Sequence, residues 1–191
     1  MATTVIGLAG RPGCGKSAVV ETLAQRPGIE AMDLDRIAWE TYASGTPTYD
    51  RLVGRFGHRI LSKDGRIDRG VLANLALSDP AARRDLEAIV HPAVTERMNA
   101  LIRSAERRGI DVLFVEGALV ASSPHVDRSA FDAILWLDAS DRTRRNRLRA
   151  DGREGHADRM DGVSPDERAI RVDAEGTVAE VAERVWRAIK R

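Results

Sequence analysis

Short, continuously apolar runs alternate along this chain with longer stretches in which apolar residues recur every three or four positions. Runs of the first kind are typical of strands buried on both faces, and the second pattern is typical of helices. Strands are predicted at residues 4–9, 29–32, 112–115, 133–137 and 170–172. Helices are predicted at residues 17–24, 37–43, 48–56, 69–77, 143–150 and 178–189. This alternation predicts an α/β fold in three layers, with a parallel five-stranded sheet between helices.

A further, longer helix is predicted from Asp79 onward, because Asp79 can cap it and Pro80 suits its first position. Its apolar residues keep one face at positions 86, 89, 90, 94, 98, 101 and 102. Pro92 is expected to break or kink this helix near His91, since proline lacks a backbone N–H and restricts the residue before it. Segment 152–167 is polar and interrupted by glycines, so it is expected to form a mobile loop or lid.

Composition and charge narrow the class of protein. The 191 residues suffice for one domain, and aromatic residues are only 4% against 43% hydrophobic, so Ala, Val, Leu and Ile must build the core. A formal net charge of +1 gives no global signal for a nucleic-acid or membrane partner. The single cysteine excludes an internal disulfide. The apolar N-terminal stretch is too short for a signal peptide or membrane span, so a soluble cytoplasmic protein is expected. No feature predicts the oligomeric state.

Residues 10–17 read GRPGCGKS and satisfy the pattern G-x-x-x-x-G-K-S/T in full, between a predicted strand and a predicted helix. Glycines let successive backbone N–H groups turn toward phosphate oxygens, and the following helix points its positive end at the same anion. Lys16 is expected to reach the β- and γ-phosphates of ATP, and the Ser17 hydroxyl to ligate Mg²⁺. The expected nucleotide-binding residues are Gly10, Arg11, Pro12, Gly13, Cys14, Gly15, Lys16, Ser17 and Ala18. A glycine-rich turn that binds nothing would leave the lysine and serine without a role.

The glycine loop predicts a nucleoside triphosphate but not the reaction. The chain has no N-K-x-D motif for guanine recognition, and it is shorter than a motor ATPase, so a small-molecule kinase fits best. Cys14 occupies a variable position of the loop, where it is either a small filler or a redox-sensitive thiol.

Two aspartates, Asp33 and Asp35, end the predicted second strand. Reacting groups of a doubly wound sheet gather at the carboxyl ends of its strands. A carboxylate there can accept a proton from an attacking hydroxyl or hold the magnesium shell. Alternatively, Asp35 caps the helix that follows.

Five fragments that follow the glycine loop in order resemble motifs of the dephospho-CoA kinase family. Residues 32–38 (MDLDRIA) resemble D-x-D-x-I/L-A-R, and residues 45–47 (GTP) resemble a G-T/A-P turn. Residues 55–61 (RFGHRIL), 64–69 (DGRIDR) and 86–92 (LEAIVHP) resemble R-F-G-x-x-I/L-L, D-G-x-I/L-D/N-R and L-x-x-I/L-x-H-P. Each fragment alone is weak, but five in order behind a phosphate loop are a strong signal. The match covers residues 4–100 and returns weakly at 131–149 and 170–189.

The resemblance implies a fold like that of P-loop nucleoside-monophosphate kinases, in a single domain spanning residues 1–191. A helical substrate-binding insertion is expected at about 45–105 and a small lid at about 141–166. It also implies transfer of the γ-phosphoryl group of ATP to the 3′-hydroxyl of dephospho-CoA. Asp35 then corresponds to the proposed catalytic base, with Asp33 beside it, and His91 belongs to the substrate-binding helical region. His91 could instead be a capping or core histidine.

The chain departs from the family pattern in the glycine loop, at the third strand and in the lid, among other positions. The glycine loop carries Arg11 and Ala18 in place of a glycine and a threonine. The third strand ends in Glu116-Gly117 rather than P-L-L-F/Y-E, and Glu116 is expected to contact the substrate or a magnesium-bound water, unless it is a solvated strand end. The lid is shorter, and among its arginines Arg147 and then Arg153 are expected to neutralise transition-state charge. A solvated basic helix accounts for most of the others.

Two alternatives remain open beside a dephospho-CoA kinase. A sister kinase could phosphorylate another nucleoside or small-molecule hydroxyl, which the altered third strand and short lid favour. A non-catalytic nucleotide-binding protein would bind ATP without turnover on any acceptor.

Overall fold

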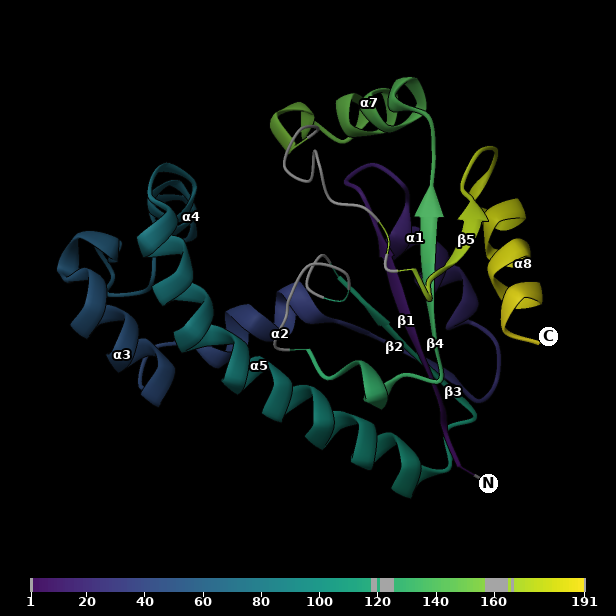
Figure 1. Cartoon of the computed structure of the whole chain (residues 1–191), viewed down its shortest axis with the longest axis horizontal. Helices are drawn as coiled ribbons and strands as arrows, with labels where there is room; N and C mark the ends of the chain where they lie inside the picture. The colour runs from purple at the N-terminus through teal and green to yellow at the C-terminus, as the bar shows by residue number, and fades with distance from the viewer. Residues whose placement is uncertain (1, 118–119, 121–125, 157–164, 166, 191) are drawn as a thin grey trace. The chain divides into compact units, whose positions relative to one another are not determined.

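The computed structural model describes residues 2–117, 120, 126–156, 165 and 167–190 (Figure 1). The strands are β1 (Thr4–Gly10), β2 (Ile29–Asp33), β3 (Val112–Glu116), β4 (Ala133–Asp138) and β5 (Ile170–Asp173). They form one sheet in the order β2-β3-β1-β4-β5, and every pairing between neighbours is parallel. The predicted parallel five-stranded sheet is confirmed. Each strand begins at its predicted residue and ends one residue later than predicted.

The helices also follow the sequence pattern. They are α1 (Lys16–Leu23), α2 (Leu34–Thr41), α3 (Pro47–Phe56), α4 (Arg69–Ser78), α5 (Pro80–Arg108), α7 (Asp141–Ala150) and α8 (Val178–Ile189). Short 3₁₀ helices lie at His58–Ile60, Arg128–Ala130 and Glu154–His156. The clearest shift is at α2, which begins at Leu34 rather than at the predicted residue 37. Asp35 therefore sits in the first turn of α2, where the positive end of the helix dipole favours a carboxylate.

The described chain divides into two compact units. The first unit contains residues up to Leu34 and from Leu101 onward, and it holds the whole sheet. The second unit contains Asp35–Ala100, with α3, α4 and most of α2 and α5. Of the predicted lid, residues 157–164 and 166 lie outside the described part of the chain.

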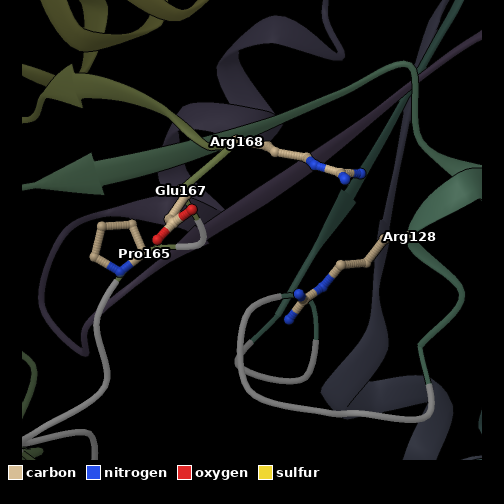
Figure 2. Close-up of a pocket in the computed structure, with 4 residues that line it drawn as sticks. All are labelled: Arg128, Pro165, Glu167 and Arg168. Atoms are coloured by element: carbon tan, nitrogen blue, oxygen red, sulfur yellow. The ribbon is translucent and has the colours of Figure 1, made fainter.

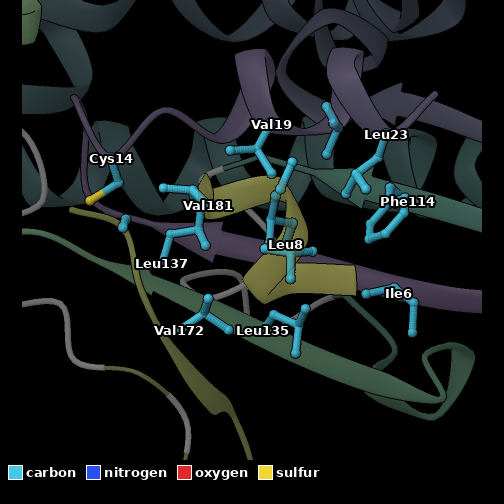
Figure 3. Packing of buried hydrophobic residues seen from close by; sticks show 14 of the residues in the cluster. Ile6, Leu8, Cys14, Val19, Leu23, Phe114, Leu135, Leu137, Val172 and Val181 are labelled. Carbon is cyan, nitrogen blue, oxygen red and sulfur yellow. The ribbon is translucent and has the colours of Figure 1, made fainter. Parts of the chain in front are cut away.

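The core of the first unit is built around β1 and β4, with α1 and α8 packed against them (Figure 3). Leu8 and Leu135 of the sheet are fully buried in one cluster with Val19 of α1 and Val181 of α8. Trp136, on the opposite face of β4, is also only 2% exposed. Burial on both faces explains why these strands read as continuous apolar runs rather than as an alternation.

The helices of the second unit are set by local capping. The Thr46 hydroxyl accepts a hydrogen bond from the Tyr49 N–H at 3.1 Å, and Pro47 takes the first position of α3. The Asp68 carboxylate accepts hydrogen bonds from the first N–H groups of α4. These caps satisfy donors that a helix leaves unpaired at its N-terminus. Buried apolar residues of this unit are Ile37, Ala38, Leu52, Phe56, Ile60, Leu72, Ala82, Val90, Val94 and Met98.

Of the break or kink predicted at Pro92, the break is wrong, because α5 runs without interruption from Pro80 to Arg108, and the kink stays a prediction. Asp79 caps it as predicted, accepting a hydrogen bond from the Ala81 N–H at 2.8 Å. A proline removes one backbone N–H donor from the helix. The lost hydrogen bond is a small part of the backbone hydrogen bonding of a 29-residue helix. Val90 and Val94 on either side of Pro92 are 6% and 1% exposed, and their packing holds the helical path.

No helix within the described part of the chain is long and apolar enough to cross a membrane.

Helix α8 offers a matched test of the packing, since it carries one buried and one exposed valine. Val181 is 1% exposed and Val178 is 41% exposed. Val181→Ala is expected to lower the free energy of unfolding by about 2–3 kcal/mol, through lost burial and the cavity left behind. Val178→Ala is expected to change it by less than about 0.5 kcal/mol. Urea denaturation of both variants measures the difference, and equal effects would contradict the described packing of α8.

Candidate functional site

The phosphate loop lies between the end of β1 and the start of α1, and two of its glycines have backbone conformations that other residues rarely adopt. Gly13 has φ 83° and Gly15 has φ 85°. A Cβ atom at Gly13 would stand 2.5 Å from the backbone oxygen of Arg144, so a side chain there collides with backbone. Gly15 occupies the N-cap of α1, and no described side chain caps that helix end. The first N–H groups of α1 are thus left to an anion.

Lys16 and Ser17 begin α1 at the open side of this loop. The Lys16 ammonium donates a hydrogen bond to the Gly10 carbonyl oxygen at 2.9 Å, so it lies back across the loop. Ser17 is exposed and Lys16 is partly exposed. Both side chains are therefore accessible to a phosphate chain held by the loop.

A buried arginine of α7 supports the loop from behind. The Arg144 side chain is 1% exposed, donates to the Pro12 carbonyl oxygen at 3.0 Å, and donates to the Asp141 carboxylate at 2.8 Å. Arg11 pairs with the same Asp141 at 3.5 Å. The Arg144 hydrogen bond and charge hold the pKa of the exposed Asp141 carboxyl below its usual range. These contacts fix the first half of the loop onto α7.

The sequence pattern missed Arg144, which it grouped with the solvated arginines of the predicted helix at 143–150. One signal was present. Arg144 and Leu148 stand four residues apart, so they share one helix face, and both are buried. An arginine on the apolar stripe of an otherwise basic helix indicates a buried cation with backbone partners.

Arg147, the first of the two predicted lid arginines, lies beside the loop from the same helix. Its guanidinium donates to the carbonyl oxygens of Ala174 and Gly176 at 3.0 and 2.9 Å, and to that of Cys14 at 3.4 Å. It therefore joins α7 to the segment after β5 and to the phosphate loop. Arg153, the second, follows the end of α7 and is exposed.

Glu175 ties the same segment to α7 from the other side. Its carboxylate accepts hydrogen bonds from the Thr143 hydroxyl and the Ser140 N–H, both at 2.7 Å. These hydrogen bonds lower the pKa of Glu175 to about 2, so it is ionised at neutral pH.

Two carboxylates stand at the carboxyl ends of adjacent strands in the first unit. Asp33 of β2 is the register partner of Glu116 of β3, so their side chains leave the sheet on the same face. Glu116 is 5% exposed, which excludes the solvated strand end as its surroundings. Within the described residues, no three His, Cys, Asp or Glu side chains gather into a metal site. A Mg²⁺ ion needs no such cage, because it binds through one or two protein oxygens, phosphates and waters. The exposed Ser17 hydroxyl meets that requirement.

The other predicted site residues belong to the second unit. Asp35 is partly exposed in the first turn of α2, directly after the residue that ends the first unit. His91 in α5 is 6% exposed, the placement that the core alternative predicts.

A pocket of about 530 Å³ in the first unit is lined by Arg128, Pro165, Glu167 and Arg168, as Figure 2 shows. None of the predicted site residues lines it.

Cys14 of the phosphate loop is 1% exposed and belongs to the core cluster of the first unit. Burial raises the pKa of its thiol, and the nearby charges of Lys16 and Arg144 offset this only in part. A buried, protonated thiol favours the filler interpretation over the redox-sensitive one.

Comparisons with known proteins point to one family. The family model for dephospho-CoA kinase matches residues 4–171. The dephospho-CoA kinase of Symbiobacterium thermophilum is 33% identical over 186 residues, covering 97% of this chain and 72% of that protein. The dephospho-CoA kinase of Geobacter sulfurreducens is 33% identical over 188 residues, covering 95% of this chain and 94% of that one. A crystal structure of a Thermus thermophilus protein is similar with a TM-score of 0.78 and 26% identity, covering 100% of this chain and 97% of the other.

The contribution of Arg144 to stability can be compared with that of an exposed arginine of the same helix, α7. Arg144→Ala is expected to lower the free energy of unfolding by about 2–3 kcal/mol, because the Pro12 carbonyl loses its donor and a cavity replaces the side chain. Arg142→Ala, at an exposed position, is expected to change it by less than about 0.5 kcal/mol. Urea denaturation compares the two, and a small effect at Arg144 would contradict its role as a buried support.

The thiol of Cys14 is expected to resist modification. In the folded chain at neutral pH it should react with a disulfide reagent at least about 100-fold more slowly than in the denatured chain, because it is buried and its raised pKa keeps it protonated. The absorbance of the released thiol measures both rates. Fast stoichiometric reaction of the folded chain would instead support a redox-sensitive thiol.

Proposed function

Because the chain belongs to the dephospho-CoA kinase family, we propose that it transfers the γ-phosphoryl group of ATP to the 3′-hydroxyl of dephospho-CoA and forms coenzyme A. The observation that carries the proposal is the phosphate loop, whose positive-φ glycines lead into an uncapped helix start that carries Lys16 and Ser17. The match to the dephospho-CoA kinase family model indicates dephospho-CoA as the acceptor.

Residues 10–18 bind the ATP phosphates. Backbone N–H groups of the loop and of the start of α1 hold the β- and γ-phosphate oxygens, which the open N-terminus of α1 supports. Lys16 exchanges its hydrogen bond with Gly10 for a phosphate oxygen and neutralises the developing charge. Ser17 ligates Mg²⁺, which supplies further neutralisation of the phosphate charge when bound.

Asp35 acts as the base on the acceptor. The hydroxyl oxygen forms a bond to the γ-phosphorus, the bond from that phosphorus to the β–γ bridging oxygen breaks, and ADP leaves. The hydroxyl proton passes to the Asp35 carboxylate. Its partial exposure and its place in the first turn of α2, where the helix dipole favours the ionised form, support this role.

The remaining predicted residues position the reactants. Asp33 and Glu116 orient the acceptor hydroxyl or a magnesium-bound water at the end of β2 and β3, and their register supports a joint role. Arg147 and Arg153 supply positive charge on the side of the lid, where Arg147 already contacts the phosphate loop. His91, which is buried in α5, helps to bind the acceptor. The near-neutral charge and single reduced cysteine support action in the cytoplasm on a small molecule rather than on nucleic acid or a membrane.

A related kinase with a different hydroxyl acceptor is the second candidate. One observation favours it: β3 ends in a buried glutamate, Glu116, followed by Gly117, where the motif of the family reads otherwise. A panel of nucleosides and alcohols tested beside dephospho-CoA separates the two candidates.

The first experiment incubates the purified chain with Mg-ATP and dephospho-CoA and detects coenzyme A by mass. We expect product from the unaltered chain and from Lys63→Ala, which removes an exposed lysine. Lys16→Ala should lose at least about a hundredfold in kcat/KM, because its charge acts on the transferring phosphoryl group. No coenzyme A from a folded chain that binds ATP would overturn the proposal, and ATP binding without turnover on any acceptor would indicate a non-catalytic protein.

Asp35→Asn tests the base. It should lower kcat by roughly 10²–10⁴ while leaving KM for ATP nearly unchanged, because the amide cannot accept the hydroxyl proton. Asp50→Asn is the control, since Asp50 is also an acidic residue in the first turn of a helix in the same unit. Steady-state kinetics compare them, and a kcat for Asp35→Asn within tenfold of the unaltered chain would remove Asp35 from the role.

A further inference from the structure

The second unit contains an open pocket of about 760 Å³ that the phosphate loop does not line. Its walls come from the end of α2 with the residues after it, and from residues 66–70 at the start of α4 with Ser62. Two arginines, Arg66 and Arg69, are among the lining residues, together with two aromatic residues, Trp39 and Tyr42. The pocket also contains Asp68, whose carboxylate accepts hydrogen bonds from the first N–H groups of α4, so its two arginines stand beside one capping carboxylate and two aromatic rings.

Trp39 is the unusual member of this set. It is 46% exposed, although burial of an indole is strongly favourable, and the guanidinium of Arg69 lies 4.1 Å from its ring centroid. The motif D-x-D-x-I/L-A-R, which begins here at Asp33, ends in an arginine. This chain has Trp39 at the position of that arginine. An aromatic ring therefore replaces a charge at the edge of the pocket.

The helical spacing relates this ring to the proposed base. Asp35, Trp39 and Tyr42 stand at intervals of four and three residues, which places them along one side of α2 and its end. Four residues of an α-helix rise about 6 Å, roughly one turn. The Asp35 carboxylate and the indole are therefore about one turn apart along the same face.

Tyr42 stands at the end of this face, where the charges of Arg69 and Asp35 both act on its phenol. Burial raises the pKa of its phenol to about 12, the charge of Arg69 lowers it, and the charge of Asp35 raises it. Both charged groups therefore lie within electrostatic reach of one phenol, which stays neutral at physiological pH. Trp39, Tyr42 and Arg69 line the same pocket, and Asp35 lies on the same side of α2 as Trp39.

We propose that Trp39 is the stacking surface for the adenine ring of the acceptor, and that Arg66 and Arg69 receive the diphosphate of the same molecule. The inference rests on the proposed function, in which Asp35 meets the 3′-hydroxyl of dephospho-CoA. Adenine is joined to the same ribose as that hydroxyl, so it must lie within one nucleoside of Asp35, which is the separation of Trp39 along α2. The pantetheine arm is joined beyond the diphosphate, so it does not need to reach Trp39.

Arg66 suits the diphosphate because its side chain is 78% exposed to solvent. Its present partner is the Asp64 carboxylate, to which two nitrogens of the guanidinium donate at 2.5 Å. Ion pairs at such positions contribute little, whereas a guanidinium binds a phosphate through two parallel hydrogen bonds. A diphosphate, which carries more negative charge than one carboxylate, is therefore expected to compete with Asp64 for this guanidinium.

Calorimetry of dephospho-CoA binding tests the stacking surface, with a non-hydrolysable ATP analogue and Mg²⁺ filling the phosphate loop. Trp39→Ala is expected to raise the dissociation constant about 5- to 150-fold, the range that base stacking on an aromatic side chain supports. Trp39→Phe should keep most of the affinity. Val71→Ala is the control, because Val71 is 37% exposed in the same unit and does not line the pocket.

A second probe, 4′-phosphopantetheine, lacks the adenosine and should bind equally to the unaltered chain and to Trp39→Ala. In turnover, Trp39→Ala should raise KM for dephospho-CoA while KM for ATP stays constant. Unchanged affinity for dephospho-CoA in Trp39→Ala, or an equal loss for 4′-phosphopantetheine, would overturn the assignment. Binding is measured without phosphoryl transfer, so a chain that binds through Trp39 but makes no coenzyme A would contradict the proposed function and keep the subsite.

Discussion

The candidate site depends on a close approach of backbone to backbone between the phosphate loop and α7. Gly13 has no space for a side chain because the Arg144 backbone lies against it, and the guanidinium of Arg144 holds the Pro12 carbonyl from inside the protein. Glycine at this point satisfies both the positive φ and the contact. No side chain caps the N–H groups at the start of α1, which follows the loop. In the proposed function, packing of α7 thus supports nucleotide binding.

In the proposed function, the chemistry is divided between the two units of the chain. The first carries the phosphate loop and the strand-end carboxylates Asp33 and Glu116. The second begins at Asp35 and carries the proposed base with the pocket proposed for the acceptor. Strand β2 and helix α2 follow each other without a linker, so the end of the sheet and the base are two residues apart in the chain. This continuity lets one fold hold ATP while another set of helices varies to suit the acceptor.

The sequence predicted the sheet closely because its parallel strands are buried on both faces, and the resulting apolar runs have sharp ends. It also predicted the phosphate loop, because glycines, lysine and serine at that spacing between a strand and a helix are typical of phosphate binding. It could not predict that α5 continues through Pro92, because tertiary packing of Val90 and Val94 overrides a local preference. Likewise, the burial of Arg144 and the contact of Arg69 with Trp39 join residues from different elements, which no local pattern encodes.

ATP binding is assigned to the first unit and the base to the second. Calorimetric measurement of Mg-ATP binding to two variants tests this assignment most directly. Lys16→Ala alters the phosphate loop in the first unit, and Asp35→Asn alters the proposed base in the second. We expect Lys16→Ala to weaken ATP binding at least about tenfold, while Asp35→Asn binds ATP within about twofold of the unaltered chain. If Asp35→Asn weakened ATP binding as much as Lys16→Ala does, Asp35 would belong to the nucleotide site and the division between the two units would be wrong.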